Sequence, residues 1–227
     1  MDTVTVHPSL YEILVRDREA GHARCADPDS AAELLPRFVG LGLLGFGAYG
    51  AVMGLVRWQL PPVDPYAVWE PWPLAGRYLL AYAGAFFGTK VAILPTYYFY
   101  ALLAGIRTHG WRIAIEVMRA QATQAMVVLG LLPLFLAAGL GAAALGSGGL
   151  RQLIVWVGTI LPFIAGLPGT AILYASLRRM ARQAVPEDEP WSPGRRGPMP
   201  GLLAVAWTGL FAFMAPVGVW GIWQALS

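Results

Sequence analysis

The feature that most constrains this chain is a run of about thirty almost unbroken apolar residues, GRYLLAYAGAFFGTKVAILPTYYFYALLAGI, from Gly76 to Ile106. One helix needs roughly 20 apolar residues to cross a bilayer core, so the run predicts a membrane-spanning segment. Two residues are unusual for such a segment. Lys90, the only lysine of the sequence, lies near the middle of the run, and Pro95 follows five residues later. A charged side chain at the bilayer centre costs about 2.5–3.5 kcal/mol on insertion scales.

The composition indicates that most of the chain belongs to the same class. Hydrophobic residues make up 57% of it and charged residues 13%, whereas about a quarter of a soluble domain is charged. We predict an all-α fold, a polytopic integral membrane protein with a polar cytoplasmic segment at 1–36 and a transmembrane domain at 37–227. The five predicted transmembrane helices are 38–56, 77–105, 120–145, 152–177 and 201–226.

The basic residues predict the orientation of this five-helix bundle. Twelve of them fall in the segments that lie inside if the N-terminus is cytoplasmic, and three, Arg57, Arg77 and Arg151, fall in the outer segments. Because cytoplasmic loops are enriched in Lys and Arg, we predict a cytoplasmic N-terminus and an outside C-terminus. No basic run exceeds two residues, so the net charge does not indicate a nucleic-acid partner.

The polar N-terminal segment has the pattern of a short amphipathic helix over Pro8–Ala20, with Ser9 as its N-cap. A second short turn is predicted over Ser30–Leu35. Two interpretations remain open: a helix that lies on the membrane surface, or an arm that docks a soluble partner.

Glycines recur in the first predicted span. Gly40, Gly47 and Gly54 are spaced seven residues apart, and Gly50 and Gly54 form a GxxxG element. Small residues let helix backbones approach closely inside a membrane. The glycines are therefore predicted to pack helices, either between two copies of the chain in a homo-oligomer or against the chain's own helices.

The connections between the spans have their own signals. The segment Arg57–Gly76 holds five prolines, which predicts an irregular loop. The charges at 112, 116 and 119 share one side of a helix, which we expect to start outside the membrane and to enter it near Ala122. A turn is predicted at Gly146–Gly149. Tryptophans beside the spans are predicted to be interfacial anchors, namely Trp58, Trp69, Trp72, Trp220 and Trp223.

Lys90 is the best candidate for a functional residue. Pro95 removes a backbone hydrogen bond beside it, and the freed carbonyls, with Thr89 and Thr96, could solvate the ammonium group. One interpretation is an ion or proton pathway, or a charge pair with a partner subunit. The other is a lysine that snorkels to an interface, or a helix broken in two at this point.

Signals for catalysis are weak. His7, His22 and His109 do not have metal-ligand spacing, and Cys25 is the single cysteine. No serine has an adjacent histidine, and no pair of carboxylates lies within the apolar runs. We therefore predict a protein that is not an enzyme and that has no cofactor, no catalytic residue and no metal site.

Three short motifs carry a resemblance to a known family. They are RDRE at 16–19, GAYGAVMG at 47–54 and LPTYYFYALLAG at 94–105. With the polar N-terminal region and five spans, the chain resembles the Yip1-like membrane protein family, in its bacterial branch. The resemblance implies work in membrane organisation and a place in the bacterial inner (plasma) membrane. Lys90 departs from the family pattern, which has its basic residue at the start of the span, where Arg77 stands.

The leading functional hypothesis is a non-enzymatic subunit or scaffold of a membrane protein complex. Its partners would be the lipid bilayer and other membrane subunits, bound through the N-terminal arm and the glycine-rich helix faces. The alternative is a small channel or transporter with a pathway near Lys90 and Pro95.

Overall fold

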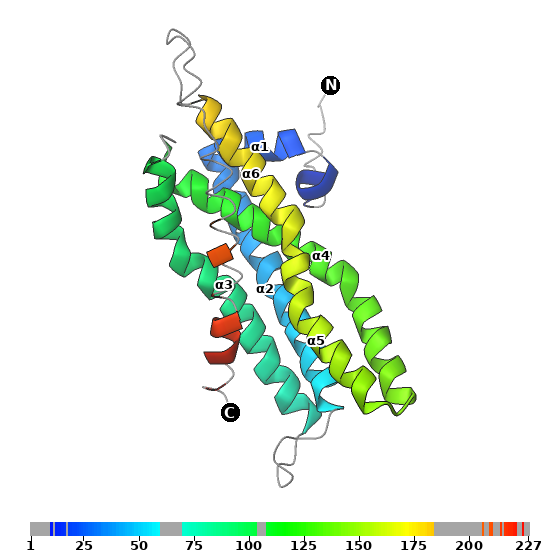
Figure 1. Ribbon diagram of the computed structural model, residues 1–227. Coiled ribbons are helices and arrows are strands. Elements are labelled where there is room, and N and C mark those ends of the chain that lie inside the picture. The colour runs from blue at the N-terminus through cyan, green and yellow to red at the C-terminus, as the bar shows by residue number, and fades with distance from the viewer. Residues whose placement is uncertain are drawn as a thin grey trace, which may run out of the picture.

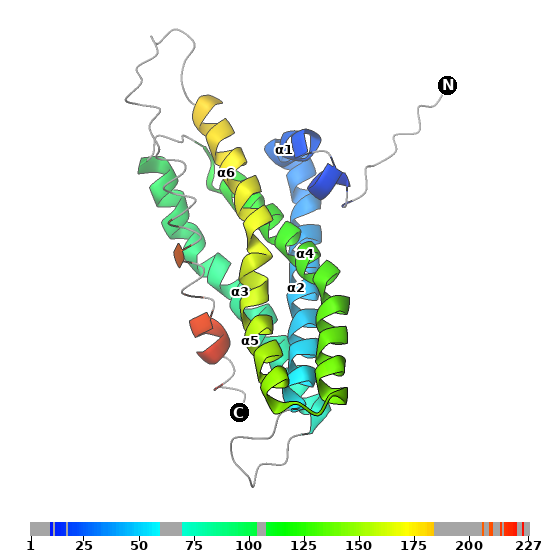
Figure 2. The ribbon, with the colours of Figure 1, turned by 45° about the vertical axis from the view of Figure 1, so that its right-hand side comes forward.

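The computed structural model describes residues 10, 12–16, 18–59, 70–103, 108–183, 206, 209–210, 214, 216–221 and 224. In this part of the chain the elements are helices. In chain order they are the π-helix η1 (Glu12–Arg16) and the α-helices α1 (Arg18–Ala26), α2 (Pro28–Trp58), α3 (Pro71–Leu103), α4 (Gly110–Ala144), α5 (Gly148–Ile164) and α6 (Gly166–Gln183). The long helices form one elongated bundle, and α1 lies at the end of the bundle where α6 ends (Figures 1 and 2).

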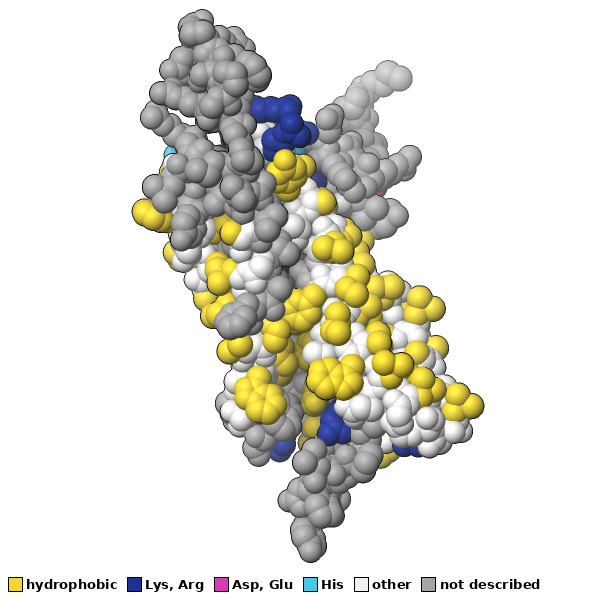
Figure 3. Space-filling view, viewed as in Figure 1, with side chains coloured by type: hydrophobic (Ala, Val, Ile, Leu, Met, Phe, Trp, Pro, Cys, Tyr) yellow, Lys and Arg dark blue, Asp and Glu magenta, His cyan; other side chains and the backbone are white. Residues whose placement is uncertain are grey.

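Four helical stretches are long and apolar enough to cross a membrane: Pro28–Trp58, Pro71–Phe99, Gly110–Ala144 and Gly148–Met180. Large apolar side chains on them face outward, such as Leu134, 69% exposed, and Trp156, 60% exposed. Figure 3 shows such side chains spread over the middle of the bundle, with basic side chains towards its ends. A lipid bilayer would cover this surface, which a monomer in water rarely exposes.

The fifth predicted span, 201–226, lies mostly outside the described residues, and so do Trp69 and Trp223. The first three predicted spans correspond to α2, α3 and α4. All three begin before the predicted spans, which was expected for α4 alone, and the predicted fourth span is divided.

The helix α2 begins at Pro28, ten residues before the predicted span, and the predicted separate turn at Ser30–Leu35 is part of it. Asp27 is its N-cap, and the backbone N–H of Ser30 donates to the Asp27 carboxylate at 3.0 Å. These hydrogen bonds from Ser30 also lower the pKa of the Asp27 carboxyl. Pro28 occupies the first turn, where its missing N–H leaves no helical bond unmade. Capping chemistry, rather than hydropathy, sets this start.

The helix α3 begins at Pro71, so the predicted loop Arg57–Gly76 was too long at both ends: α2 continues through Trp58. Pro71 and Pro73 sit in the first turn of α3, where proline is tolerated. Pro95 lies inside α3, which runs on to Leu103 as one helix. The second apolar run is thus a single helix and not a broken pair.

The fourth predicted span is two helices, α5 and α6, separated at Ala165. Pro162 has no N–H to give to the carbonyl of Gly158 four residues earlier. That carbonyl accepts a hydrogen bond from the hydroxyl of Tyr49 on α2 at 2.5 Å instead. The predicted turn before α5 is present: Gly146 has a φ of +66°, and the Ser147 hydroxyl accepts the N–H of Leu150 at 3.3 Å.

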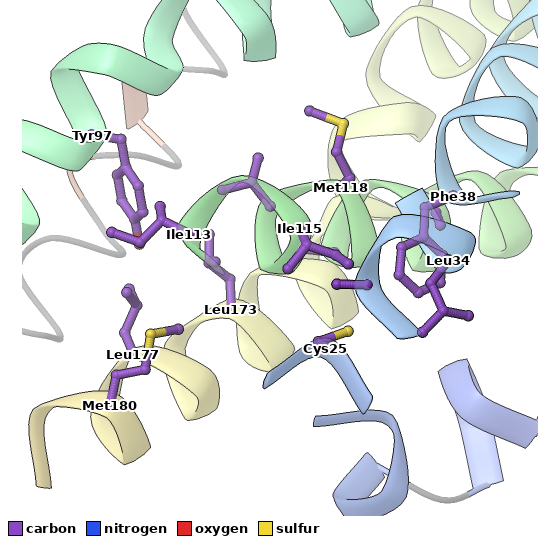
Figure 4. Close-up of a cluster of buried hydrophobic side chains, with 14 of the residues drawn as sticks. Cys25, Leu34, Phe38, Tyr97, Ile113, Ile115, Met118, Leu173, Leu177 and Met180 are labelled. Carbon is purple, nitrogen blue, oxygen red and sulfur yellow. The ribbon is translucent and has the colours of Figure 1, made fainter. Parts of the chain in front are cut away.

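Two apolar clusters hold the bundle together. One lies at the end that carries α1 and contains residues of η1, α1, α2, α3, α4 and α6. Figure 4 shows Cys25, Phe38, Ile115, Leu173 and Tyr97 of this cluster, which come from different helices. The other is aromatic and lies further along the bundle. Its rings are contributed by several helices, including Phe46, Tyr49, Tyr82, Phe86 and Phe135.

The predicted packing glycines lie mostly against other helices of the same chain. A Cβ on Gly54 would lie 2.7 Å from the Cα of Ala75, and one on Gly50 would meet the carbonyl of Tyr78, both on α3. Gly47 faces Leu79 of α3 at 3.5 Å. A Cβ on Gly40 has no described atom within 4 Å.

We expect Gly54→Ala to lower the free energy of unfolding by about 1–3 kcal/mol, because the added methyl group would overpack the contact with the α3 backbone. The matched control is Gly40→Ala, which places the same methyl group in open space and should leave stability unchanged or slightly higher. Unfolding of the purified protein in mixed detergent micelles measures both. Equal effects of the two substitutions would contradict the close contact of α2 with α3.

Candidate functional site

The first half of α4 is buried on all sides. Every residue from Ile115 to Ala125 is buried, because this stretch passes between α2 and α6 (Figures 1 and 2). Its polar side chains therefore enter the interior of the bundle. We define the polar core as these side chains and their partners on neighbouring helices: His22, Lys90, Glu116, Arg119, Gln121, Gln124 and Ser176.

Glu116 is the centre of a charged cluster made by α1, α4 and α6. The Nδ1 of His22 lies 2.6 Å from its Oε1, and the hydroxyl of Ser176 donates to its Oε2 at 2.9 Å. The guanidinium of Arg119, one turn further along α4, lies 3.6 Å from Oε2. Glu116 and Arg119 are each 1% exposed. A carboxylate this deeply buried requires these partners, since burying an unpaired charge is very costly.

The same cluster attaches the N-terminal segment to the bundle. Arg119 donates through Nη2 to the carbonyl of Ile13 at 3.4 Å. A Cβ on Gly21 would lie 2.6 Å from that Nη2, so a glycine lets α1 approach the guanidinium. Ile13 and Leu14 of η1 are buried as well. The N-terminal segment thus packs on α4 of its own chain, an arrangement that neither predicted interpretation included.

Cys25 is fully buried beside this cluster. Burial, with a further contribution from the Glu116 charge, raises the pKa of its thiol to about 12. At pH 8 only about one thiol in ten thousand would then be ionised, and the thiolate is the reactive form. We expect Cys25 to resist a maleimide in the folded protein and to react within minutes after denaturation.

The control for this reactivity is Ala23→Cys with Cys25→Ser, since Ala23 is exposed on the same helix. Its labelling should be at least tenfold faster under native conditions. Rapid native labelling of Cys25 would mean that α1 does not stay docked on the bundle.

Deeper in the bundle, Gln124 of α4 joins three helices. Its Oε1 accepts from the Nζ of Lys90 on α3 at 3.1 Å, and its Nε2 donates to the carbonyl of Pro162 on α5 at 2.7 Å. Gln121 donates to the carbonyl of Phe86 at 3.5 Å. Lys90 is 5% exposed. The sequence pointed to carbonyls and threonines near Pro95 as partners of Lys90, whereas this contact comes from another helix.

The two groups of the polar core lie along one helix. Glu116 and Gln124 are eight residues apart on α4, which is about 12 Å along the axis. Near Lys90 the interior of the bundle is filled by aromatic rings. The rings of Phe46 and Phe86 stack with their centroids 4.5 Å apart, and the ring centroid of Phe163 lies 5.6 Å from that of Phe86. The polar core therefore extends from one end of the bundle to an aromatic layer.

The other predicted site residues lie at the surface. Pro95 is exposed on α3. Trp58 at the end of α2 and Trp72 in the first turn of α3 are 45% and 76% exposed at the same end of the bundle, and Trp220 is 60% exposed. Exposure at helix ends is what interfacial anchors require. Among the described residues no three His, Cys, Asp or Glu side chains are placed to hold a metal ion.

Most of the polar core was not predicted as a site. The charges of Glu116 and Arg119 were attributed to a helix face outside the membrane, and His22 was set aside for its spacing. The sequence contains no clear signal for this burial. In residues 113–124 Ile115, Met118 and Ala122 form an apolar stripe at helical spacing, with polar residues on the other sides, which is the pattern of an ordinary amphipathic helix at a surface.

Searches with this chain find no matching family model, curated protein or solved structure. The resemblance to the Yip1-like family accordingly stays a prediction.

Proposed function

We propose that this chain is a small, non-enzymatic membrane transporter for inorganic anions, with the polar core as its internal binding path. The observation that carries the proposal is the burial of ionisable side chains inside a bundle of apolar helices, with Lys90 at 5% and Arg119 at 1% exposure. Ionisable residues in the interior of a membrane bundle are costly, and they commonly mark ion pathways or proton relays.

The charges of the polar core favour an anion. The described buried residues include two basic side chains, Lys90 and Arg119, and one acidic side chain, Glu116, beside neutral amides. With Lys90 protonated, these side chains carry a net positive charge, which attracts anions and repels cations. The amide groups of Gln121 and Gln124 could exchange hydrogen bonds with a passing oxyanion or halide.

The aromatic layer favours a transporter over an open channel. Stacked Phe46 and Phe86, with Phe163 beside them, fill the core next to Lys90. An ion could pass only if these rings moved. The interruption at Ala165 between α5 and α6 lies next to the contact of Gln124 with Pro162, and such interruptions are where transporter helices bend.

The subunit or scaffold hypothesis remains a second candidate, favoured by the wide apolar surface of α5, where Leu153, Trp156 and Ile160 are exposed. The surfaces that were predicted to bind partners are less available for this, because Gly50 and Gly54 face α3 and the helices η1 and α1 pack on α4 of the same chain. Purification from native membranes in mild detergent tests it: stoichiometric companions would support this candidate, and a companion-free protein would count against it.

The transport proposal is tested by uptake of radiolabelled phosphate and chloride into proteoliposomes. We expect uptake above that of protein-free liposomes, and a fall of about 10- to 100-fold with Lys90→Met, since a hydrogen bond to a charged group contributes about 1.5–3 kcal/mol. The matched control is Arg77→Gln, which removes an exposed positive charge from the same helix. No uptake of either anion, or equal losses in the two variants, would overturn the proposal.

We further propose that the end carrying α1 faces the cytoplasm and that residues 201–226 form a fifth span. Basic side chains support this orientation: Arg24, Arg37, Arg178, Arg179 and Arg182 belong to that end. Arg151 lies at the opposite end, where it donates to the carbonyl of Gln59 at 2.9 Å. Reporter fusions at Gly194 and Ser227 should report cytoplasm and outside, respectively; a shared side would refute the fifth span.

A further inference from the structure

A small pocket opens between α1, α4 and α6, beside the charged cluster. Its cavity volume is about 50 Å³, which is room for a few water molecules or one small ion. The pocket is lined by His22, Arg119, Ile172, Ala175, Ser176 and Arg179.

His22 presents an unused nitrogen to this pocket. Its side chain is 7% exposed and its Nδ1 is engaged by Glu116. Within the described part of the chain, the Nε2 of His22 is buried and has no hydrogen-bond partner. Buried polar atoms are nearly always paired, so an orphaned nitrogen that lines a pocket marks a place for a water molecule or a small polar ligand.

Among the described residues the lining of the pocket is basic: Arg119, Arg179 and His22 contribute to it, and none of the described lining residues is acidic. Glu116 lies next to this lining, but His22, Ser176 and Arg119 already engage its two oxygens. Arg178 and Arg182 lie on the same end of α6, and Figure 3 shows basic side chains gathered at that end of the bundle. The field at the pocket therefore favours an anion.

The position of the pocket along the bundle selects the kind of anion. The apolar sequence of α6 ends at Leu177, so Arg179 lies just beyond it. Lipid phosphates lie just outside the hydrocarbon core, at that level. A guanidinium matches the oxygens of a phosphate group with two parallel hydrogen bonds.

We propose that this pocket binds a phosphate group, held by Arg119 and Arg179 with His22 at its base. With the proton of the neutral ring on Nδ1, which faces the Glu116 carboxylate, the Nε2 of His22 accepts a hydrogen bond from a phosphate hydroxyl group. The group could belong to a lipid headgroup or to inorganic phosphate, because both offer the same oxygens. The proposal that phosphate binds here follows from the pocket and does not depend on the proposed function. Only a further role of the pocket, as the entry site for a transported anion, rests on the proposed function.

The test uses the full-length protein, purified in a detergent without phosphate groups. Isothermal titration with inorganic phosphate is one arm, and titration with a short-chain phosphatidic acid is the other. We expect saturable binding in at least one arm, weakened about tenfold or more by Arg179→Gln. The matched control is Arg178→Gln, since Arg178 is equally an exposed arginine of α6 but does not line the pocket; it should change binding less than twofold.

The outcomes distinguish the two sources of the phosphate group, and they distinguish the phosphate site from the transport proposal. Binding of inorganic phosphate assigns the site to the free ion, and binding of the lipid alone assigns it to a headgroup. No binding in either arm at millimolar concentration, or equal weakening by the two arginine variants, overturns the site. Binding without anion uptake by proteoliposomes would support the phosphate site and overturn the transport proposal. Uptake without binding would support the transport proposal and overturn the phosphate site.

Discussion

Replacing Glu116 by alanine is expected to lower the free energy of unfolding by about 3–5 kcal/mol, which is the usual cost of breaking a buried ion pair from one side. The substitution removes the acceptor of two hydrogen bonds, from His22 and Ser176, and the counter-charge of Arg119. Arg119 is 1% exposed, so water cannot replace the lost carboxylate. The docking of α1 should loosen first, because His22 joins it to Glu116.

Thermal unfolding in detergent measures this effect, which should be a fall in Tm of about 6–20 °C for a protein of this size. Glu33→Ala is the matched control. It removes an exposed acid from α2 and should leave the Tm within about 2 °C. Labelling of Cys25 gives an independent readout of the docking of α1, and Glu116→Ala should accelerate it.

A double substitution separates pairing from packing. Arg119→Leu should be destabilising by itself because it leaves the carboxylate without its cation, whereas Glu116→Leu with Arg119→Leu should cost less than the sum of the two single changes. A buried ion pair replaced by apolar residues is often close to neutral. If the two single effects simply add, the two side chains do not form the pair that the structure has.

The sequence was sufficient for the parts of the fold that depend on composition over many residues. The apolar runs located α2, α3 and α4, and glycine and serine at 146 and 147 located the turn before α5. Helix ends were less predictable. Hydropathy does not register that Asp27 and Pro28 can begin a helix ten residues ahead of an apolar run, or that Pro71 and Pro73 are compatible with a first turn.

The polar core could not be predicted because its contacts are tertiary. His22 and Glu116 are 94 residues apart in sequence, and Lys90 and Gln124 are 34 apart. The sequence identified Lys90 as costly without indicating which helix would hold its ammonium group. In the same way, the division of the fourth span depends on partners: the carbonyl of Gly158, which Pro162 leaves without a helical donor, accepts a hydrogen bond from the hydroxyl of Tyr49, a residue of another helix.

Gln124 should be the second most sensitive polar position, although it carries no charge. Gln124→Leu removes the acceptor at 3.1 Å from the Lys90 ammonium and the donor at 2.7 Å to the carbonyl of Pro162. A hydrogen bond to a charged group contributes about 1.5–3 kcal/mol and an orphaned buried carbonyl costs about 1–3 kcal/mol. Measured hydrogen bonds between membrane helices are weaker, about 0.6 kcal/mol on average. We therefore expect a loss of about 2–4 kcal/mol.

Reversible unfolding in mixed micelles measures this loss, and Gln152→Leu on the exposed side of α5 is the matched control, expected to be neutral. The decisive comparison adds Lys90→Met to Gln124→Leu. Once the ammonium is gone its acceptor is no longer needed, so the double variant should be more stable than Gln124→Leu alone. A double variant that is less stable than Gln124→Leu would mean that Lys90 is held chiefly by other groups, and that the amide of Gln124 is not what makes a lysine tolerable inside this bundle.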